Sequence, residues 1–392
     1  MASTAPPEHE PDVEDHLAEE ILDLYNDFPG LAHRFRIVTK IGEGTFSSVY
    51  KAEDRLWASH HVAQAQAQVA ALEANSGVCL CRMVALKRIY VTSSPQRIYN
   101  ELKILDELGG HPNVGPLITI LRHEDQVLAV LPYFQFDDWR QLQIRMDMDQ
   151  IRSYLRALLR GLAHVHAKNY IHRDIKPSNF LYNMARRTGI IVDFGLAQEV
   201  RSPTAKERAQ IDAQAAKYPV RATTNLQTRI RRMFPGAGGG CFAKDTRPSI
   251  RANRAGTRGF RAPEVLFKVV HQTPVVDIWS VGVILLSLFS GRFPFFNATD
   301  DQEALLEIAH LFGREAMQAA ARTFRRTFNT NVPSVSDPVP LRTLCQRLWS
   351  ERYRDIPDEG FDFLERLLTL NPAERLTAEA ALRHPFLAEP EP

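Results

Sequence analysis

The sequence predicts an α+β fold of two lobes, a small lobe built on an antiparallel sheet and a larger, mostly helical lobe. Short apolar runs, the first two joined by a Gly-rich turn, recur within residues 34–131, which is typical of strands. Amphipathic helical segments replace them over about residues 135–388. The chain has 392 residues, 44% of them hydrophobic, so its length and composition suffice for two or three domains with sizeable cores.

Residues 1–33 form an acidic extension in front of the small lobe. Residues 1–30 contain nine acidic and no basic side chains. In "VEDHLAEEILDLY", residues 13–25, the apolar side chains recur on one helical face and the acids lie on the other. We expect this helix to dock on its own domain, and a partner-binding helix is the alternative.

The small lobe begins with the pattern strand, Gly-rich turn, strand, interruption, strand. The interruption, residues 55–82, is rich in Ala, Gln and His and is interpreted as an insertion that lengthens a connection between strands. After "CRMVALKRIYV" comes a helix that contains Glu101, and "QVLAVLPYF" predicts a buried strand that enters a hinge at Pro132.

The large lobe carries a second insertion, residues 201–255. It contains twelve Lys or Arg residues against three Asp or Glu residues and lacks sustained periodicity, so we expect a basic, flexible insertion. A solvated loop or a nuclear import signal accounts for this charge. Direct nucleic-acid binding is the weaker alternative, because aromatic residues are not interleaved with the basic ones.

Composition narrows the class of protein. The formal net charge of +2 indicates neither a nucleic-acid binder nor a membrane-surface protein. The four cysteines, Cys79, Cys81, Cys241 and Cys345, are too scattered for a disulfide framework, which favours a reducing compartment. No apolar run approaches ~18 residues, and we expect a soluble, intracellular protein without membrane contact. Cys79 and Cys81 are interpreted as structural or incidental, and zinc binding is left open.

Two short segments of the small lobe contain residues suited to binding phosphate. In "IGEGTFSSVY", Gly42 and Gly44 would let backbone amides approach phosphate oxygens without an intervening Cβ. Such hairpins occur in many folds, so this motif is weak by itself. Lys87, in an apolar strand, needs an anion, and Glu101 together with a triphosphate would supply it. A lysine that snorkels from a strand edge is the alternative.

Two segments of the large lobe contain residues suited to phosphoryl transfer. In "IHRDIKPSNFLY", Asp174 is a candidate base for a substrate hydroxyl, Lys176 lies beside the transferring group, and Asn179 is a candidate magnesium ligand. In "IIVDFGLAQ", Asp193 supplies a second hard oxygen ligand at the end of an apolar strand.

A further motif follows in "GTRGFRAPEVL". We expect Glu264 of this segment to form an ion pair with Arg375 in "NPAERLTAEAALRHPF", a pair that would brace the large lobe.

The order of these motifs along the chain resembles that of the eukaryotic protein kinases, and the resemblance covers about residues 34–388. It implies a serine/threonine phosphotransferase that uses ATP and Mg²⁺. Lys87 and Glu101 would align the phosphates, and Ser47 occupies the third glycine position of the family pattern, which is a departure. The residues that would contact the nucleotide are Ile41, Gly42, Gly44, Val49, Ala85, Lys87, Leu131, Pro132 and Tyr133.

Within the protein kinases, "HRDIKPSNFLY", "GTRGFRAPEVL", "DIWSVGVILLSLFSGRFPFFNATDD" and the long insertion resemble the cell-division-cycle-seven group. This resemblance implies an obligatory activator subunit, a nuclear location, and substrates in the replicative helicase at Ser or Thr residues flanked by acidic or phosphorylated residues. The casein kinase one family is an alternative, but it lacks Ala-Pro-Glu and a comparable insertion. A catalytically silent scaffold is a second alternative.

Two arginines in "GTRGFRAPE" are candidates for substrate recognition. The resemblance implies that Arg258 and Arg261 flank the stretch where kinases of this fold receive the residue after the phosphoacceptor. Guanidinium groups bind carboxylate or phosphate bidentately. Internal pairing with an acid is the alternative for each.

Overall fold

The computed structural model describes residues 13–44, 46–56, 82–90, 92–201, 205, 209, 254–335 and 337–388, and the side chains from residue 16 onward. The chain divides into two compact units, Met1–Gln135 and Phe136–Pro392. Most of the two insertions expected at 55–82 and 201–255, with Cys79, Cys81 and Cys241, lies outside the described residues.

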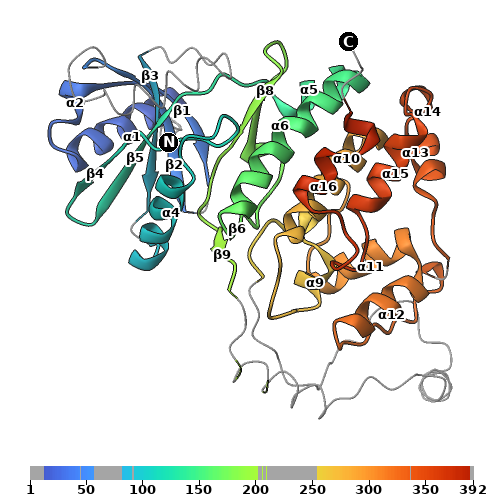
Figure 1. The fold of residues 1–392 in the computed structure, drawn as a ribbon. Helices are drawn as coiled ribbons and strands as arrows, with labels where there is room; N and C mark the ends of the chain where they lie inside the picture. Colours follow the sequence, from blue (N-terminus) through green and yellow to red (C-terminus); the bar gives the residue numbers. More distant parts are fainter. Residues whose placement is uncertain are drawn as a thin grey trace, which may run out of the picture. The chain divides into compact units, whose positions relative to one another are not determined.

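The first unit contains one five-stranded antiparallel sheet with the strand order β1-β2-β3-β5-β4 (Figure 1). Register pairs Gly42 with Val49 and Ala85 with Leu131, which places the candidate nucleotide contacts on neighbouring strands. The elements of this unit are α1 Val13–Asp27, α2 Leu31–Arg34, β1 Phe35–Glu43, β2 Ser47–Asp54, β3 Met83–Ile89, α4 Pro95–Glu107, β4 Thr119–His123 and β5 Gln126–Pro132.

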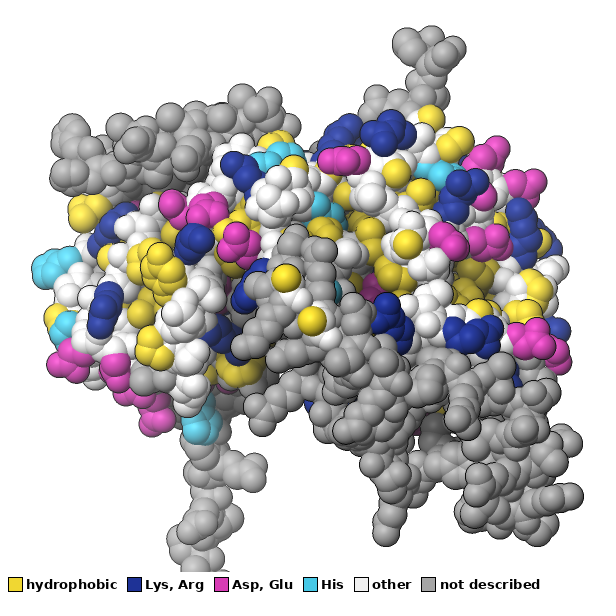
Figure 2. Space-filling view, turned by 60° about the horizontal axis from the view of Figure 1, so that its bottom comes forward, with side chains coloured by type: hydrophobic (Ala, Val, Ile, Leu, Met, Phe, Trp, Pro, Cys, Tyr) yellow, Lys and Arg dark blue, Asp and Glu magenta, His cyan; other side chains and the backbone are white. Residues whose placement is uncertain are grey.

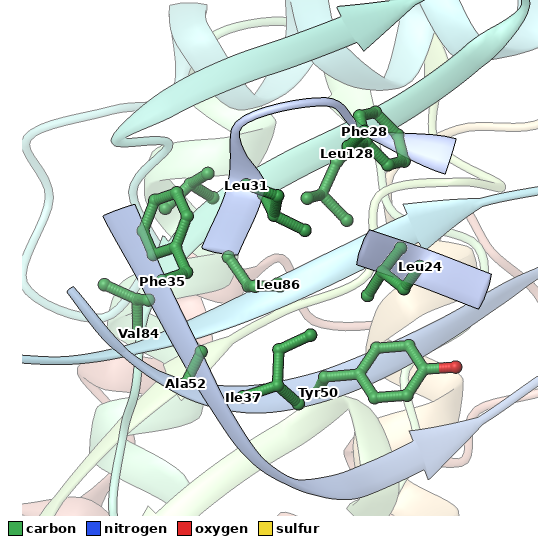
Figure 3. Packing of buried hydrophobic residues seen from close by; sticks show 11 residues of the cluster. Leu24, Phe28, Leu31, Phe35, Ile37, Tyr50, Ala52, Val84, Leu86 and Leu128 are labelled. Carbon is green, nitrogen blue, oxygen red and sulfur yellow. The ribbon is translucent and has the colours of Figure 1, made fainter. Parts of the chain in front are cut away.

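The helix expected at residues 13–25 is α1, and it docks on its own unit, as predicted. Leu24 of α1 and Phe28, the residue after the helix, pack with Leu31 against apolar side chains of β1, β2, β3 and β5 (Figure 3). Burying such large apolar side chains is worth about 1.5–3 kcal/mol each. The described part of the acidic extension therefore contributes to the core of the small lobe.

Helix α4 begins at a well-formed N-cap. The side chain of Ser94 accepts a hydrogen bond from the backbone N–H of Arg97, and Pro95 follows at the first helical position, where no N–H is needed. Glu101, Ile104 and Leu105 form its buried face. The cap thus fixes where the helix starts, and with it which face presents Glu101.

The second unit is mostly helical, and no helix among the described residues is long and apolar enough to cross a membrane. Its elements are α5 Trp139–Arg145, α6 Met148–Ala167, β6 Tyr170–Ile171, β7 Phe180–Asn183, β8 Thr188–Ile191, β9 Gln198–Glu199, α9 Pro263–Leu266, α10 Val275–Ser290, α11 Asp301–Phe312, α12 Arg314–Thr323, α13 Leu341–Leu348, α14 Ser350–Tyr353, α15 Asp358–Leu367 and α16 Ala378–Leu382.

Two long helices organise this unit. Helix α6 begins with a capping box formed by Asp147 and Gln150, and its apolar face is buried. Every residue of α10 is buried, and the helix ends at Gly291, whose φ of 70° suits a left-handed C-cap. After α6, the short strands β6 and β7 flank the loop that carries Asp174 and Asn179, and β8 and β9 flank the loop that carries Asp193.

Candidate active site

Lys87 and Glu101 form a buried ion pair. The Nζ atom of Lys87, on β3, lies 2.6 Å from Oε1 of Glu101, on α4, and the two residues are 7% and 5% exposed. The pairing expected from the sequence is therefore confirmed. Because breaking such a pair leaves an uncompensated buried charge, the pair fixes α4 to the sheet as well as holding the ammonium group in place.

The glycine-rich hairpin joins β1 to β2. The backbone N–H of Gly44 donates to the carbonyl of Ser47 over 2.8 Å, which closes the turn. A Cβ added at Gly42 would come no closer than 3.7 Å to another atom, and one at Gly44 no closer than 3.8 Å. Neither glycine has a positive φ. Packing within the chain does not require glycine here, which fits a hairpin that a phosphate group approaches closely.

The remaining candidate nucleotide contacts lie on the same sheet. Ala85 and Pro132 are buried, whereas Ile41, Val49, Leu131 and Tyr133 are half-buried. The backbone N–H of Tyr133 donates to the carbonyl of Met83, so the chain continues the β3–β5 pairing into the hinge segment. These residues thus combine apolar surface with backbone polar groups, the usual composition of a small-molecule site.

Asp277, near the start of α10, holds the loop that contains Asp174. Its carboxylate accepts hydrogen bonds from the backbone N–H groups of His172 and Arg173 over 2.9 and 2.8 Å, and it contacts Nε2 of His166. Burial would raise the pKa of Asp277, but the hydrogen bond with His166 and the neighbouring imidazoles outweigh burial and hold the pKa below its ordinary value. No role for Asp277 was predicted from the sequence.

Asp174 lies in the same loop, and polar groups from three residues surround its carboxylate. Lys176 Nζ lies 2.9 Å from Oδ2, and Asn179 Nδ2 donates to the same oxygen over 3.0 Å. Thr257 donates its backbone N–H and its hydroxyl to Oδ1. Burial alone would raise the pKa of Asp174, but the charge of Lys176 and the hydrogen bonds from Thr257 outweigh burial and lower it. The carboxylate is thus ionised at neutral pH.

Asn179 and Asp193 offer hard oxygen ligands for a metal ion. The Nδ2 of Asn179 donates hydrogen bonds to the backbone carbonyl and to the carboxylate of Asp174. Its Oδ1 has no hydrogen-bond partner among the described residues. The backbone N–H of Val192 donates to the carbonyl of Asn179, which brings Asp193 beside this loop. One amide oxygen and one carboxylate fit Mg²⁺, which takes few protein ligands besides waters and phosphates.

Gly256 allows Thr257 to reach Asp174. Its φ is +107°, and a Cβ there would lie 2.3 Å from the backbone carbonyl oxygen of Arg173. Only glycine fits this approach. Gly256 and Thr257 belong to the segment "GTRGFRAPEVL", in which the sequence had pointed only to the arginines and to Glu264.

The candidate substrate arginines surround Asp301, the first residue of α11. Arg261 donates to Asp301 Oδ1 and to the carbonyl of Gly256, both over 2.9 Å. Arg254 donates to Asp301 Oδ2, and Nε of Arg258 lies 3.8 Å from Oδ1. Arg261 is therefore paired with an acid, the alternative that the sequence left open. Its side chain is 18% exposed, against 39% for Arg258.

The expected pair of Glu264 and Arg375 is also confirmed. Two parallel hydrogen bonds of 2.7 and 3.0 Å join them, and their side chains are 2% and 0% exposed. Arg375 also donates to the carbonyls of Thr369 and Val275, so its guanidinium is well satisfied. The pair joins α9, which contains Glu264, to the segment between α15 and α16, which contains Arg375.

This arrangement defines the class of protein. A model of the protein kinase domain matches residues 35–214 and 240–387, so the chain belongs to the protein kinases, and it is a serine/threonine kinase of the cell-division-cycle-seven type, as its relatives show.

The cell cycle serine/threonine-protein kinase hsk1 of Schizosaccharomyces pombe is 42% identical over 94% of this chain and 75% of its own length. The probable cell division control protein 7 homolog 1 of Encephalitozoon cuniculi is 39% identical over 90% of this chain and 92% of its own length. The human cell division cycle 7-related protein kinase is 28% identical over 95% of this chain and 92% of its own length.

Proposed function

We propose that this kinase transfers the γ-phosphoryl group of ATP to Ser or Thr residues that precede an acidic or phosphorylated residue. The observation that carries the transfer step is the cluster at Asp174, where an ionised carboxylate lies 2.9 Å from the ammonium group of Lys176. Asp174 accepts the proton of the substrate hydroxyl, and Lys176 stabilises the charge that develops on the transferring group.

The small lobe binds and orients the nucleotide in this proposal. Gly42 and Gly44 cover the phosphates, and Lys87, held by Glu101, aligns them. The adenine base lies against Ile41, Val49, Ala85 and the segment Leu131 to Tyr133. Mg²⁺, held by Asn179 and Asp193, neutralises phosphate charge when it is bound.

The preference for acidic substrates rests on the arginines around Asp301. Three guanidinium groups share this carboxylate. The Nη2 atoms of Arg254, Arg258 and Arg261 have no hydrogen-bond partner within the described part of the chain, whereas their Nη1 atoms are hydrogen-bonded. A guanidinium whose Nη2 atom is unpaired can still bind a carboxylate or a phosphate. Each charge-assisted contact contributes about 1.5–3 kcal/mol.

We further propose an activator subunit that binds the small lobe. Helix α4 presents Tyr99, which is 62% exposed, on the outer side of the helix that carries Glu101. An aromatic residue at such a position is typical of a protein interface. A nuclear location and a role in starting DNA replication, through the subunits of the replicative helicase, complete the proposal.

Direct recognition of nucleic acid is not part of this proposal. On the face shown in Figure 2, Lys and Arg side chains are interspersed with Asp and Glu side chains over the described surface. The formal net charge of the whole chain is only +2. Electrostatic binding to a phosphate backbone depends instead on clustered basic residues.

The specificity is tested with matched peptides that carry Asp, phosphoserine, Ala or Lys after the serine. We expect kcat/KM to be about tenfold higher for Asp than for Ala, and the double variant Arg258→Ala/Arg261→Ala to lose this ratio. Equal kcat/KM for Asp and Ala in the wild type, or a ratio that survives the double variant, would reject the proposal.

The activator is tested by comparing the purified chain with the chain after candidate partners are added. We expect a large gain in activity with the activator, and a weaker response in Tyr99→Ala. Full activity of the isolated chain, with no gain from any candidate, would reject the activator.

A further inference from the structure

Helix α1 contacts the strands of the nucleotide-binding sheet through polar side chains as well as through its apolar face. Leu24 of its C-terminal half and Phe28, the residue after it, lie in the sheet core (Figure 3). Asp27 pairs with Arg88, the residue after Lys87 on β3. All of α1 lies before residue 35, where the match to the protein kinase domain begins. The general kinase fold therefore does not account for these contacts.

Tyr25 extends the hydrogen bonding of strand β1. Its hydroxyl accepts from the backbone N–H of Ile37 over 2.9 Å and donates to the carbonyl of Phe35 over 3.2 Å. Strand β1 lies at the edge of the sheet, and its pairing with β2 is irregular between Ile37 and Thr39. The tyrosine thus satisfies backbone groups at a place where the ladder is interrupted.

Glu20 contacts two residues that pair across β1 and β2. Its carboxylate lies 2.8 Å from Nζ of Lys40 and accepts from the hydroxyl of Tyr50 over 3.2 Å. Lys40 and Tyr50 are opposite each other in the register, and the next pair along the ladder is Gly42 with Val49. The contact therefore lies at the base of the glycine-rich hairpin.

The charges at this contact are mutually stabilised. The hydrogen bond from Lys40 holds the pKa of Glu20 below its ordinary value. Burial would lower the pKa of Lys40, but its hydrogen bonds to Glu20 and to Glu43 raise it. Glu43 lies in the hairpin itself, 2.8 Å from Lys40 Nζ. Lys40 thus connects α1 to the hairpin through two carboxylates.

We propose that Glu20 is a positioning residue for nucleotide binding, because through Lys40 and Tyr50 it fixes the base of the glycine-rich hairpin. This inference rests on the proposed role of that hairpin in ATP binding. Glu20 does not touch the nucleotide, and its effect on ATP comes from orienting the strands that do. A hairpin whose base is held in place loses less conformational freedom when the nucleotide binds.

The test compares Glu20→Ala with Glu19→Ala. Glu19 is the neighbouring acid on α1, its side chain is 76% exposed, and its only described partner is His16. Alanine favours helix at both positions, so both variants keep α1. We expect Glu20→Ala to raise the KM for ATP about threefold and to leave kcat at saturating ATP unchanged, the size of effect typical of a half-exposed ion pair. Glu19→Ala should match the wild type.

Two further variants make the result specific. Lys40→Met should raise the KM for ATP to a similar degree, and the double variant Glu20→Ala/Lys40→Met should not exceed the larger single effect, because both act through one contact. Glu20→Gln, which keeps an acceptor oxygen, should give an intermediate KM. An unchanged KM in Glu20→Ala, or a fall in kcat with equal KM, would overturn the inference.

Gly42→Ala distinguishes this failure from a failure of the proposed function. The fold has room for the added methyl group, whose nearest neighbour would be 3.7 Å away, so the variant tests ligand approach alone. If Gly42→Ala leaves the KM for ATP unchanged, the hairpin is not the nucleotide site and the proposed function fails. If Gly42→Ala raises the KM and Glu20→Ala does not, only the inference about Glu20 fails.

Discussion

Thr257 donates both its backbone N–H and its hydroxyl to the same oxygen of Asp174, Oδ1, each over 2.7 Å. Lys176 donates to the Thr257 hydroxyl over 2.9 Å and contacts Oδ2 of Asp174 over the same distance. The three side chains therefore form a closed ring of polar contacts. Because Thr257 comes from the segment that precedes α9, the ring couples the conformation of that segment to the orientation of the Asp174 carboxylate, the candidate base.

The first prediction concerns this hydroxyl. Thr257→Val keeps the shape of the side chain but removes the donor to Asp174, so we expect kcat to fall about tenfold with little change in the KM for ATP. Thr257→Ser, which keeps the hydroxyl, should retain most of the activity. Steady-state kinetics at saturating ATP gives the comparison, and equal kcat values for the valine variant and the wild type would contradict a role for Thr257.

The second prediction concerns pH. Burial would raise the pKa of Asp174, but Lys176 and Thr257 outweigh burial and lower it. The carboxylate therefore stays ionised at pH values below its ordinary pKa, and its contribution to activity is lost only as the pH falls through the lowered pKa. The acid limb of the kcat profile due to Asp174 should therefore lie below about pH 4. In Thr257→Val one lowering contact is gone, and the acid limb should move to higher pH. A limb that stays in place, or moves down, contradicts this assignment.

The third prediction concerns Glu264 and Arg375, which are paired and almost fully buried. Glu264→Gln leaves the guanidinium of Arg375 without its anion, so we expect a loss of about 3–5 kcal/mol in the free energy of unfolding. Arg187→Gln is the control, since its pair with Asp149 is half exposed and should contribute about 1 kcal/mol or less. Denaturant unfolding measures both, and similar costs for the two variants would refute the bracing role.

The fourth prediction concerns Gly256. In Gly256→Ala the new Cβ would lie 2.3 Å from the carbonyl oxygen of Arg173, and the positive φ adds strain. We expect kcat to fall at least about tenfold, because the displacement separates Thr257 from Asp174. Gly110→Ala is matched for φ, at +90°, and its Cβ would meet nothing within 4 Å. It should cost about 1 kcal/mol of stability and leave kcat unchanged. Equal kcat values for both variants would contradict the prediction.

Several parts of the fold and site could be predicted because their signals are local or belong to ordered motifs. The apolar periodicity of residues 13–25 predicted both α1 and its docking, and the apolar face indeed packs in the sheet core. Lys87 lies in a mostly apolar strand and Glu101 on the buried face of α4, where an unpaired charge is too costly to leave. Their pairing follows from that cost.

Other contacts could not be predicted, because folding brings together residues far apart in the sequence and no local pattern indicates which of them pair. Thr257 contacts Asp174, which is 83 positions away in the sequence, and Asp277 contacts His172, which is 105 positions away. Asp301 pairs with Arg261, which is 40 positions away in the sequence, and also lies near Arg258. The sequence could therefore only leave the internal pairing of these arginines open. Single polar residues at such separations give no periodic signal.

The most direct test of the central claim, that Asp174 serves as the base for the substrate hydroxyl, is the rate of a single turnover with labelled ATP and a Ser-Asp peptide. The comparison is between the wild type and Asp174→Asn, each in the presence of the activator. We predict that Asp174→Asn slows phosphoryl transfer about a thousandfold while its Kd for ATP stays within about twofold of the wild type. A variant that transfers phosphate at the wild-type rate would contradict the account.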